Sequence, residues 1–286
     1  MVYFDPMSKK QQQQPQRKGE RKNDKTDWVP ATLSEYDGVR FLHLDSIWVQ
    51  GAMRIRKPQQ LELEYIQRML AWMLWRDAEH LNEGLAVQLG LGAAALTRFS
   101  HKVLKMRTTA VELNPTVIAA CRSWFHLPED DERLTVLNMD ASAWVQDPLN
   151  LQTVAVLNVD LYDHDAASPV LDDEDFYRAC HGVLEEGGLM TVNLFGRAAS
   201  FARSASRIAR VFGSDQVWSL APTKEGNTVL VAGRHVLVPD REELERRAAN
   251  IESKFAVYGL PARKWLRLVR PLPMSIINQL HSEPHS

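Results

Sequence analysis

Apolar and polar positions along this chain change their pattern near residue 86. From there to residue 195, short apolar runs alternate with stretches of helical periodicity. The apolar runs, which we predict as strands, are residues 86–91, 109–113, 134–139, 154–159 and 189–195. The predicted helices between them are residues 93–104, residues 115–125, a short helix near Ser142 and residues 173–185. This alternation predicts an α/β fold whose parallel sheet is covered by helices on both faces.

The segment before this alternation is patterned differently. Residues 39–55 carry apolar and β-prone side chains on both sides of Asp45 and Ser46, which predicts a hairpin or a small antiparallel sheet. Residues 58–75 place apolar side chains at spacings of four, as on one face of an amphipathic helix, and we expect their Met and aromatic residues to lie in the core. We therefore predict an N-terminal β element with a linking helix over residues 28–76, and a catalytic domain over residues 77–270.

The two ends of the chain carry few apolar residues. Residues 1–27 include a Gln run and a small basic excess but no apolar secretory segment. They predict a disordered tail, because they cannot bury enough apolar area to offset the entropy of ordering; the alternative is an arm that contacts a partner. Before the C-terminal tail, residues 271–286, we predict an antiparallel hairpin (residues 216–223 and 227–234) and a surface helix (residues 241–255).

Composition excludes several classes of protein. A content of 45% hydrophobic and 24% charged residues is typical of a soluble globular protein, and a net charge of −2 gives no argument for nucleic-acid binding. No apolar run approaches the roughly 18 to 20 residues that cross a bilayer. The two cysteines, Cys121 and Cys180, both fall in predicted helices, so a disulfide scaffold is disfavoured and we expect a cytoplasmic protein.

Glycines follow the first strand of the alternating region. Gly90 and Gly92 lack a Cβ, which lets the backbone approach a ligand, although Ala95 replaces the third glycine of the G-x-G-x-x-G pattern. Glu112 ends the next strand about twenty residues later, where a carboxylate accepts hydrogen bonds from both ribose hydroxyls. The alternatives are a tight strand-to-helix turn for the glycines and a solvated strand end for Glu112. Together, however, the two signals favour a nucleoside-bearing cofactor.

Carboxylates follow two further strands. Asp140, next to Ala141, is placed either to accept from an adenine amino group or to cap the following helix. Asp160, Asp163 and Asp165 come close together after residues 154–159, and such a cluster suits a cationic amine or a metal. Metal is the poorer choice, because the histidines show no paired spacing and no C-x-x-C occurs. We therefore expect an amine, with one carboxylate removing its proton.

These motifs, in this order, resemble a known family. "LDSIWVQGAMRI", "VQLGLGAAALTRF", "AVELNP", "NMDASAW" and "NVDLYDHDAASP" look like the spermidine synthase (polyamine aminopropyltransferase) family, and in particular its divergent bacterial spermidine-synthase-like branch, over roughly residues 39–235. The resemblance implies a Rossmann-like, methyltransferase-type doubly wound sheet behind a small N-terminal β domain, usually in a homodimer. It implies transfer of an aminopropyl group from decarboxylated S-adenosylmethionine to a small amine, without a metal.

The resemblance also assigns roles to single residues. Besides Gly90, Gly92 and Ala141 in the cofactor site, six side chains match positions of the family that bind the two substrates. They are Gln50 near the donor, Tyr65 in the acceptor cleft, Glu112 at the ribose, Asp140 on the adenine side, Asp160 as general base and Asp163 as the aspartate that holds the acceptor amine.

The match is incomplete at three positions. Ala93 stands where the family has an aspartate that grips the donor's ammonium group, so one element that discriminates against ordinary S-adenosylmethionine is missing. Ile66 replaces His or Gln, and His164 replaces proline. Three functions stay open: an aminopropyltransferase with an altered grip on donor or acceptor, an S-adenosylmethionine-dependent methyltransferase, and a nucleoside-binding protein with little catalysis.

Two basic groups on predicted helices are interpreted as solvated surface. The first is His101, Lys102 and Lys105. The second is Arg197, Arg203, Arg207 and Arg210, for which contact with a partner or an anionic group is the alternative.

Overall fold

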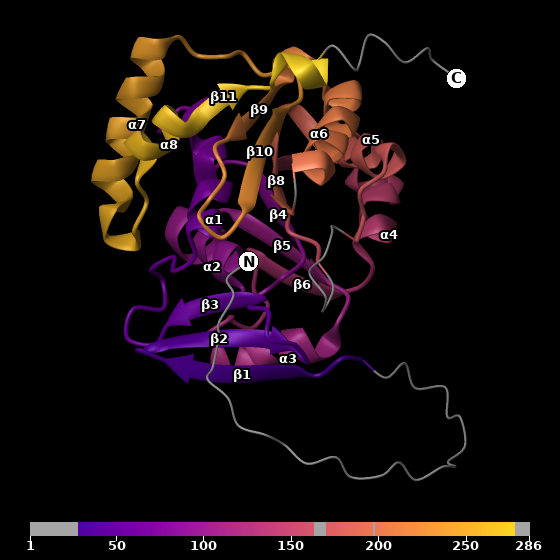
Figure 1. The fold of residues 1–286 in the computed structure, drawn as a ribbon. Helices are drawn as coiled ribbons and strands as arrows, with labels where there is room; N and C mark the ends of the chain where they lie inside the picture. The colour runs from indigo at the N-terminus through magenta and orange to yellow at the C-terminus, as the bar shows by residue number, and fades with distance from the viewer. Residues whose placement is uncertain (1–27, 163–169, 197, 278–286) are drawn as a thin grey trace.

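Two β-sheets organise residues 28–162, 170–196 and 198–277, which are the residues that the computed structural model describes (Figure 1). The smaller sheet is antiparallel and contains β1 (Ala31–Tyr36), β2 (Val39–Leu44) and β3 (Gly51–Arg54). It confirms the prediction of a small antiparallel sheet, but β1 was not predicted. Nearly all side chains of β1 are exposed. Its sequence therefore lacks the alternation of apolar and polar residues that predicts a strand.

The larger sheet has the order β11-β9-β10-β8-β7-β4-β5-β6. Its strands are β4 (Leu85–Leu89), β5 (Arg107–Glu112), β6 (Leu134–Asn138), β7 (Val154–Val159), β8 (Leu184–Phe195), β9 (Val217–Leu220), β10 (Asn227–Gly233) and β11 (Val269–Pro271). The strands β4 to β8 run parallel to their neighbours, whereas β9, β10 and β11 pair antiparallel. This is the predicted doubly wound α/β sheet, with the predicted hairpin near its edge.

Helices cover both faces of this sheet (Figure 1). They are α1 (Glu64–Met69), η1 (Leu70–Trp75), α2 (Ala95–Arg98), η2 (Phe99–Leu104), α3 (Pro115–Trp124), α4 (Ala141–Gln146), η3 (Pro148–Asn150), α5 (Glu174–Val183), α6 (Ala198–Phe212), η4 (Ser214–Gln216), α7 (Arg241–Phe255), η5 (Ala256–Tyr258) and α8 (Ala262–Leu268). Buried residues of α4, α5 and α6 form one apolar core with the sheet, and those of α1, η1, α7 and α8 form another.

The linking helix is shorter than predicted but more deeply buried. Regular α-helix begins only at Glu64 and gives way after Met69 to the tighter 3-10 geometry of η1. All six residues of η1 are buried, among them Trp72 and Met73, so their expected place in the core is confirmed. This core lies between the sheet and α7, which covers η1 from outside.

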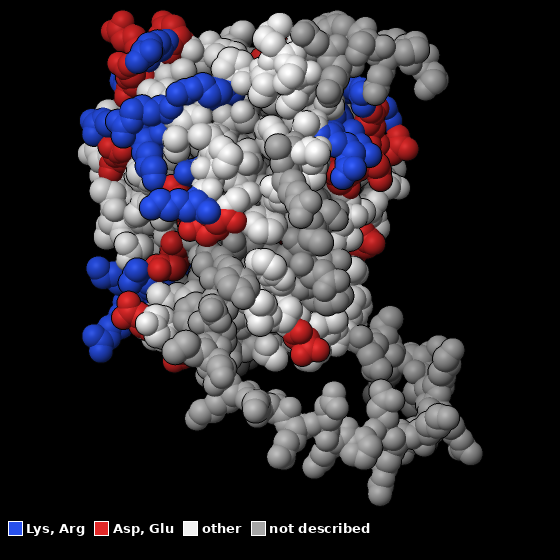
Figure 2. All heavy atoms as spheres, viewed as in Figure 1, with Lys and Arg blue, Asp and Glu red and all other residues white. Residues whose placement is uncertain are grey.

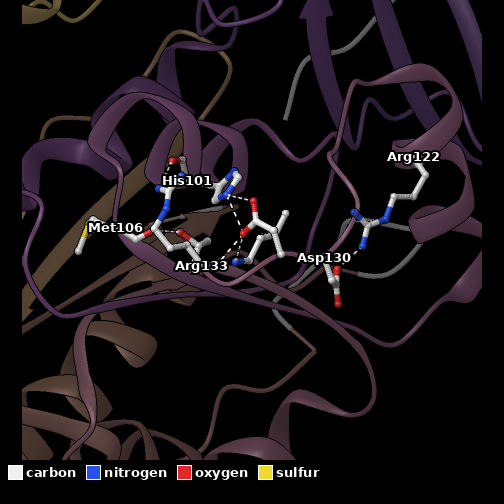
Figure 3. Close-up of polar contacts among 8 residues, drawn as sticks. His101, Met106, Arg122, Asp130 and Arg133 are labelled. Carbon is white, nitrogen blue, oxygen red and sulfur yellow. Dashed lines mark hydrogen bonds and ion pairs between the residues drawn. The ribbon is translucent and has the colours of Figure 1, made fainter.

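The predicted helix over residues 93–104 is divided. The chain enters it through Ala94 in the left-handed conformation (φ +56°), and after Arg98 it continues as a π-helix. Our interpretation of His101 as solvated surface is wrong: His101 is 4% exposed and its Nε2 lies 2.9 Å from the Asp131 carboxylate, which also accepts from the Arg133 backbone N–H (Figure 3). Strand pairing of β5 with β6 brings this distant carboxylate under the helix.

Two of the arginines of α6, Arg207 and Arg210, form ion pairs. Arg207 Nη1 lies 2.9 Å from Asp172, and Arg210 Nη1 lies 2.8 Å from Glu174 at the start of α5. These ion pairs fasten α6 to α5, which corrects the interpretation of a simply solvated face. Arg203 is exposed as expected, and Arg197 lies outside the described residues.

Candidate active site

The main cleft opens at the carboxyl ends of β4, β5 and β7. Strand β4 lies between β5 and β7, and the chain leaves it in one direction towards β5 and β6 and in the other towards β7 and β8. Ligands of doubly wound sheets bind at such a switch point. The cleft holds about 970 Å³ of space outside the protein atoms, part of it open to solvent. Its lining combines apolar side chains with a few polar groups, as is typical of small-molecule sites.

The cleft brings together the predicted site residues that the structure describes. Its lining includes Gln50, Tyr65, Gly90, Gly92, Glu112, Asp140, Ala141 and Asp160. Asp163, His164 and Asp165 lie outside the described residues. The roles of all these residues stay predictions, but the eight that line the cavity come from six separate stretches of the sequence.

The glycines of this cleft are required by close backbone packing as well as by access to a ligand. Gly90 has φ +82°, and a Cβ there would lie 2.2 Å from the Asp160 carbonyl oxygen. Pairing of Leu89 with Val159 sets these two residues side by side at the strand ends. Gly92 has φ +50°, and its Cβ would lie 2.9 Å from the Gln50 carbonyl oxygen. No L side chain suits either position.

The small sheet docks onto the same turn. A Cβ at Gly51, the first residue of β3, would lie 2.4 Å from the Ala93 backbone nitrogen. This contact carries Gln50 to the cleft, where Leu42 and Leu44 of β2 add apolar surface. The N-terminal β element therefore forms one wall of the site, although it is separate from the larger sheet.

Glu112 is held in place from two sides. Its Oε2 accepts from the Leu91 backbone N–H at 2.9 Å, and its Oε1 accepts from the Asn114 backbone N–H at 2.8 Å. Burial raises the pKa of its carboxyl group, and these hydrogen bonds oppose the rise. Each carboxylate oxygen keeps a second lone pair, so the group can still accept hydroxyl hydrogen bonds.

Asp140 combines the two roles that its sequence position left open. Its Oδ1 accepts from the Ser142 backbone N–H at 2.6 Å and so caps α4, and its exposed side chain also lines the cleft. The cap occupies one oxygen of the carboxylate. The other carboxylate oxygen makes no part of this cap, so Asp140 can still accept a hydrogen bond from an adenine amino group, as predicted.

Asp160 is the centre of a polar cluster at the end of β7. Its Oδ1 accepts from Asn193 Nδ2 at 2.9 Å, and the hydroxyl of Tyr65 interacts with the same carboxylate. Burial raises the pKa of Asp160 above its ordinary value, and the interactions with Asn193 and Tyr65 oppose this rise. Burial beside this carboxylate also raises the pKa of Tyr65. A carboxylate in this setting is a stronger base than an exposed one.

Two polar residues of the cleft, Asn193 and Tyr162, were missed from the sequence. Asn193 of β8 supports Asp160 and is itself supported by Asn227 Nδ2, 3.1 Å from its Oδ1. The Tyr162 hydroxyl donates to the Asn193 carbonyl at 2.9 Å and accepts from the Phe195 backbone N–H at 2.6 Å. The signal that could have found Asn193 is its polar side chain in the otherwise apolar run of residues 189–195.

Other features of the described residues lie apart from this cleft. Within residues 28–162, 170–196 and 198–277, no three His, Cys, Asp or Glu side chains are grouped to hold a metal ion. The same ranges contain no helix with the length and apolar character needed to cross a bilayer. A second hollow lies among arginines of α7, α8 and β11, where basic side chains gather with acidic ones between them (Figure 2).

Comparisons with known proteins agree with this geometry. A family model described as "Spermine/spermidine synthase domain" matches residues 65–208. A polyamine aminopropyltransferase of Chromobacterium violaceum is 30% identical over 228 residues, covering 79% of this chain and 84% of the relative. One of Neisseria meningitidis is 28% identical over 237 residues, covering 82% and 86%.

Solved structures show the same fold. A probable spermidine synthase of Corynebacterium glutamicum superposes with a TM-score of 0.67 at 20% identity, covering 88% of this chain and 90% of that chain. This likeness confirms the methyltransferase-type Rossmann-like sheet. Since the family model spans half of the chain and the relatives cover most of it, this chain belongs to the spermine/spermidine synthase family.

Proposed function

We propose that this protein is an aminopropyltransferase that moves an aminopropyl group from decarboxylated S-adenosylmethionine to a small amine. The observation that carries the proposal is the arrangement of two carboxylates in one cleft: Glu112 is fixed beside the glycine turn, and Asp160 is fixed by Asn193 and lies near Tyr65. In a family of transferases, this arrangement supports a donor site and an amine site that share one cavity.

Donor binding uses the sheet edge and the small sheet. We assign the ribose to Glu112, the backbone approach to Gly90 and Gly92, and the adenine side to Asp140 and Ala141. Gln50 extends from the small sheet towards the sulfonium end. The apolar side chains of the cleft offer surface for the base, and burial of that surface supports binding.

The reaction requires a neutral amine. An alkylammonium has a pKa near 10 and no lone pair with which to attack, so a base has to take its proton. We assign this role to Asp160, with Tyr65 lining the acceptor side and Asp163 holding the far end of the amine. The amine nitrogen then bonds to the carbon next to the sulfonium, the carbon–sulfur bond breaks, and methylthioadenosine leaves as a neutral thioether. Alignment of the two substrates supplies much of the rate.

The test is calorimetric titration with decarboxylated S-adenosylmethionine, S-adenosylmethionine and methylthioadenosine, followed by turnover with a mixture of small amines. We expect the decarboxylated donor to bind more tightly than the carboxylated one and an aminopropylated amine to form. Preference for the carboxylated donor would favour methyl transfer, which the alanine at position 93 makes the main competitor. Absence of binding by all three ligands would remove the nucleoside site itself.

We also propose that the enzyme is a cytoplasmic homodimer that acts without nucleic acid or membrane. The family resemblance supports the dimer, and the balanced charge and the two buried, unpaired cysteines support the other parts. Light scattering of the purified protein tests the dimer: a mass near 65 kDa is expected from a chain of 32.6 kDa, and a monomer mass would contradict it.

A further inference from the structure

A buried hydrogen-bond acceptor without a donor lies beside the active site. Gln88 of β4 is 4% exposed. Its Nε2 donates to the Gly90 carbonyl at 2.7 Å and lies 3.4 Å from the Leu89 carbonyl. Because two carbonyls face the nitrogen, the orientation of the amide is settled by chemistry. The oxygen Oε1 then points elsewhere and has no hydrogen-bond partner among the described residues.

The strand geometry shows where this side chain lies. Along β4, Val87 and Leu89 belong to the core under α4 and α5, whereas Ala86 belongs to the core on the opposite face. Alternation places Gln88 on the face of Ala86, towards α1 and α2. A small side cavity lies there, with a volume of about 10 Å³, room for about one water-sized group, and it is lined by Gln88, Gln50, Ile66, Ala93, Leu96 and Asp160, among others.

This side cavity joins the main cleft. Gln50, Gly92 and Asp160 line both spaces. Among the described residues that line the side cavity, Asp160 is the one ionisable side chain, and most of the rest are apolar. The buried Arg98 nearby does not line it, since its Nη1 donates to the carbonyls of Ala93 and Phe125. The cavity therefore combines a narrow apolar passage, an unsatisfied acceptor and an acidic group.

We propose that Gln88 determines donor specificity: its carboxamide oxygen accepts a hydrogen bond from the primary ammonium group at the end of the donor's short alkyl arm. The arm lies in the cleft and only its water-sized ammonium group occupies the side cavity, where Asp160 provides the negative charge that favours a cation. An unsatisfied buried acceptor costs free energy that a cationic donor removes. This inference rests on the proposed function, and it assigns to β4 a contact that the alanine at position 93 cannot make.

The test compares two ligands that differ by the aminopropyl arm and, with it, by the positive charge on sulfur. Decarboxylated S-adenosylmethionine has the ammonium arm, and methylthioadenosine shares its nucleoside but lacks the arm. We expect Gln88→Leu to weaken binding of the decarboxylated donor about 10-fold, the loss of one hydrogen bond to a charged group, and to change methylthioadenosine binding less than 2-fold. Gln88→Met, which is closer in shape, should behave in the same way and serves if the leucine variant does not fold.

A matched control is Gln67→Leu. Gln67 Nε2 also donates to a backbone carbonyl, that of Leu61, but this side chain lines neither cavity. We expect this variant to bind both ligands as the parent does. Equal weakening of both ligands by the Gln88 variants, or no change in either, would overturn the assignment of Gln88. Failure of the parent protein to bind either ligand would instead overturn the proposed function.

Discussion

Tyr65 of α1 and Asp160 at the end of β7 line the same cleft, and the Tyr65 hydroxyl interacts with the Asp160 carboxylate. These residues are separated by 95 positions, and they meet because α1 packs over the sheet next to the cleft. The interaction opposes the rise in the pKa of Asp160 that burial produces. The pair therefore joins the wall of the amine site to its expected base.

Removing the Tyr65 hydroxyl should shift the pH dependence of activity. In Tyr65→Phe, the Asp160 carboxylate loses an interaction that favours its charged form, so its pKa rises further. Since the base works only when ionised, activity falls as pH drops through this pKa. We expect the acidic limb of kcat/KM to move about 1 pH unit higher. The measurement is a pH profile with saturating donor.

Tyr177→Phe is the control for this shift. The Tyr177 hydroxyl donates to Asp172 at 2.8 Å, so this variant also loses a bond between Tyr and Asp, but outside the cleft. An acidic limb that moves equally in both variants would contradict a specific role of Tyr65.

Replacing the base should separate activity from stability. Asp160→Asn keeps the shape of the side chain but cannot take a proton, so turnover should fall about 10²- to 10⁴-fold. Because the folded state holds the proton of Asp160 more tightly than the unfolded state, its contribution to stability is largest at low pH. That contribution is lost as pH rises through the raised pKa. The amide should therefore leave Tm at pH 7 unchanged or higher, as measured by calorimetry. Unchanged turnover would remove Asp160 as the base.

The contact between Gly90 and Asp160 should make Gly90→Ala costly. The new Cβ meets the Asp160 carbonyl and also sits at positive φ. Gly187 has a similar φ of +75° with nothing within 4 Å of its Cβ position. Gly187→Ala should therefore lose about 1 kcal/mol from backbone strain alone, and Gly90→Ala at least about 2 kcal/mol more, with weaker donor binding. If urea unfolding gave equal losses of unfolding free energy for the two variants, the contact between the new Cβ and the Asp160 carbonyl would cost nothing.

Glu112→Gln should weaken nucleoside binding without abolishing the fold. The amide nitrogen faces either the Leu91 or the Asn114 N–H, so one of these bonds is lost, along with the charge that we expect to hold the ribose. Methylthioadenosine binding should weaken about 10- to 100-fold. The control is Glu252→Gln on α7, which removes a carboxylate that pairs with Arg263 of α8. This variant should bind methylthioadenosine as the parent does. Normal binding by the Glu112 variant would place the sugar elsewhere.

Sequence patterns were sufficient for the larger sheet and for most of the candidate site. The parallel strands are buried on both faces, so their apolar runs stand out, and the candidate carboxylates stand at the ends of such runs. The expected strand ends at Glu112 and Asp160 agree with the structure for this reason. The pattern of apolar positions failed to predict two elements. β1 is exposed and so has no apolar face, and η1 is buried on all sides and so has no polar face.

Local sequence by itself determined which side chains stand at the carboxyl ends of the strands, because a parallel sheet gathers those ends on one edge. Only the tertiary structure decided their partners. His101 meets Asp131, Asn193 reaches Asp160, and Gln88 keeps an oxygen without a donor through contacts between segments far apart in the chain. Such contacts depend on strand order and helix packing, which the hydrophobic period of any one segment does not specify.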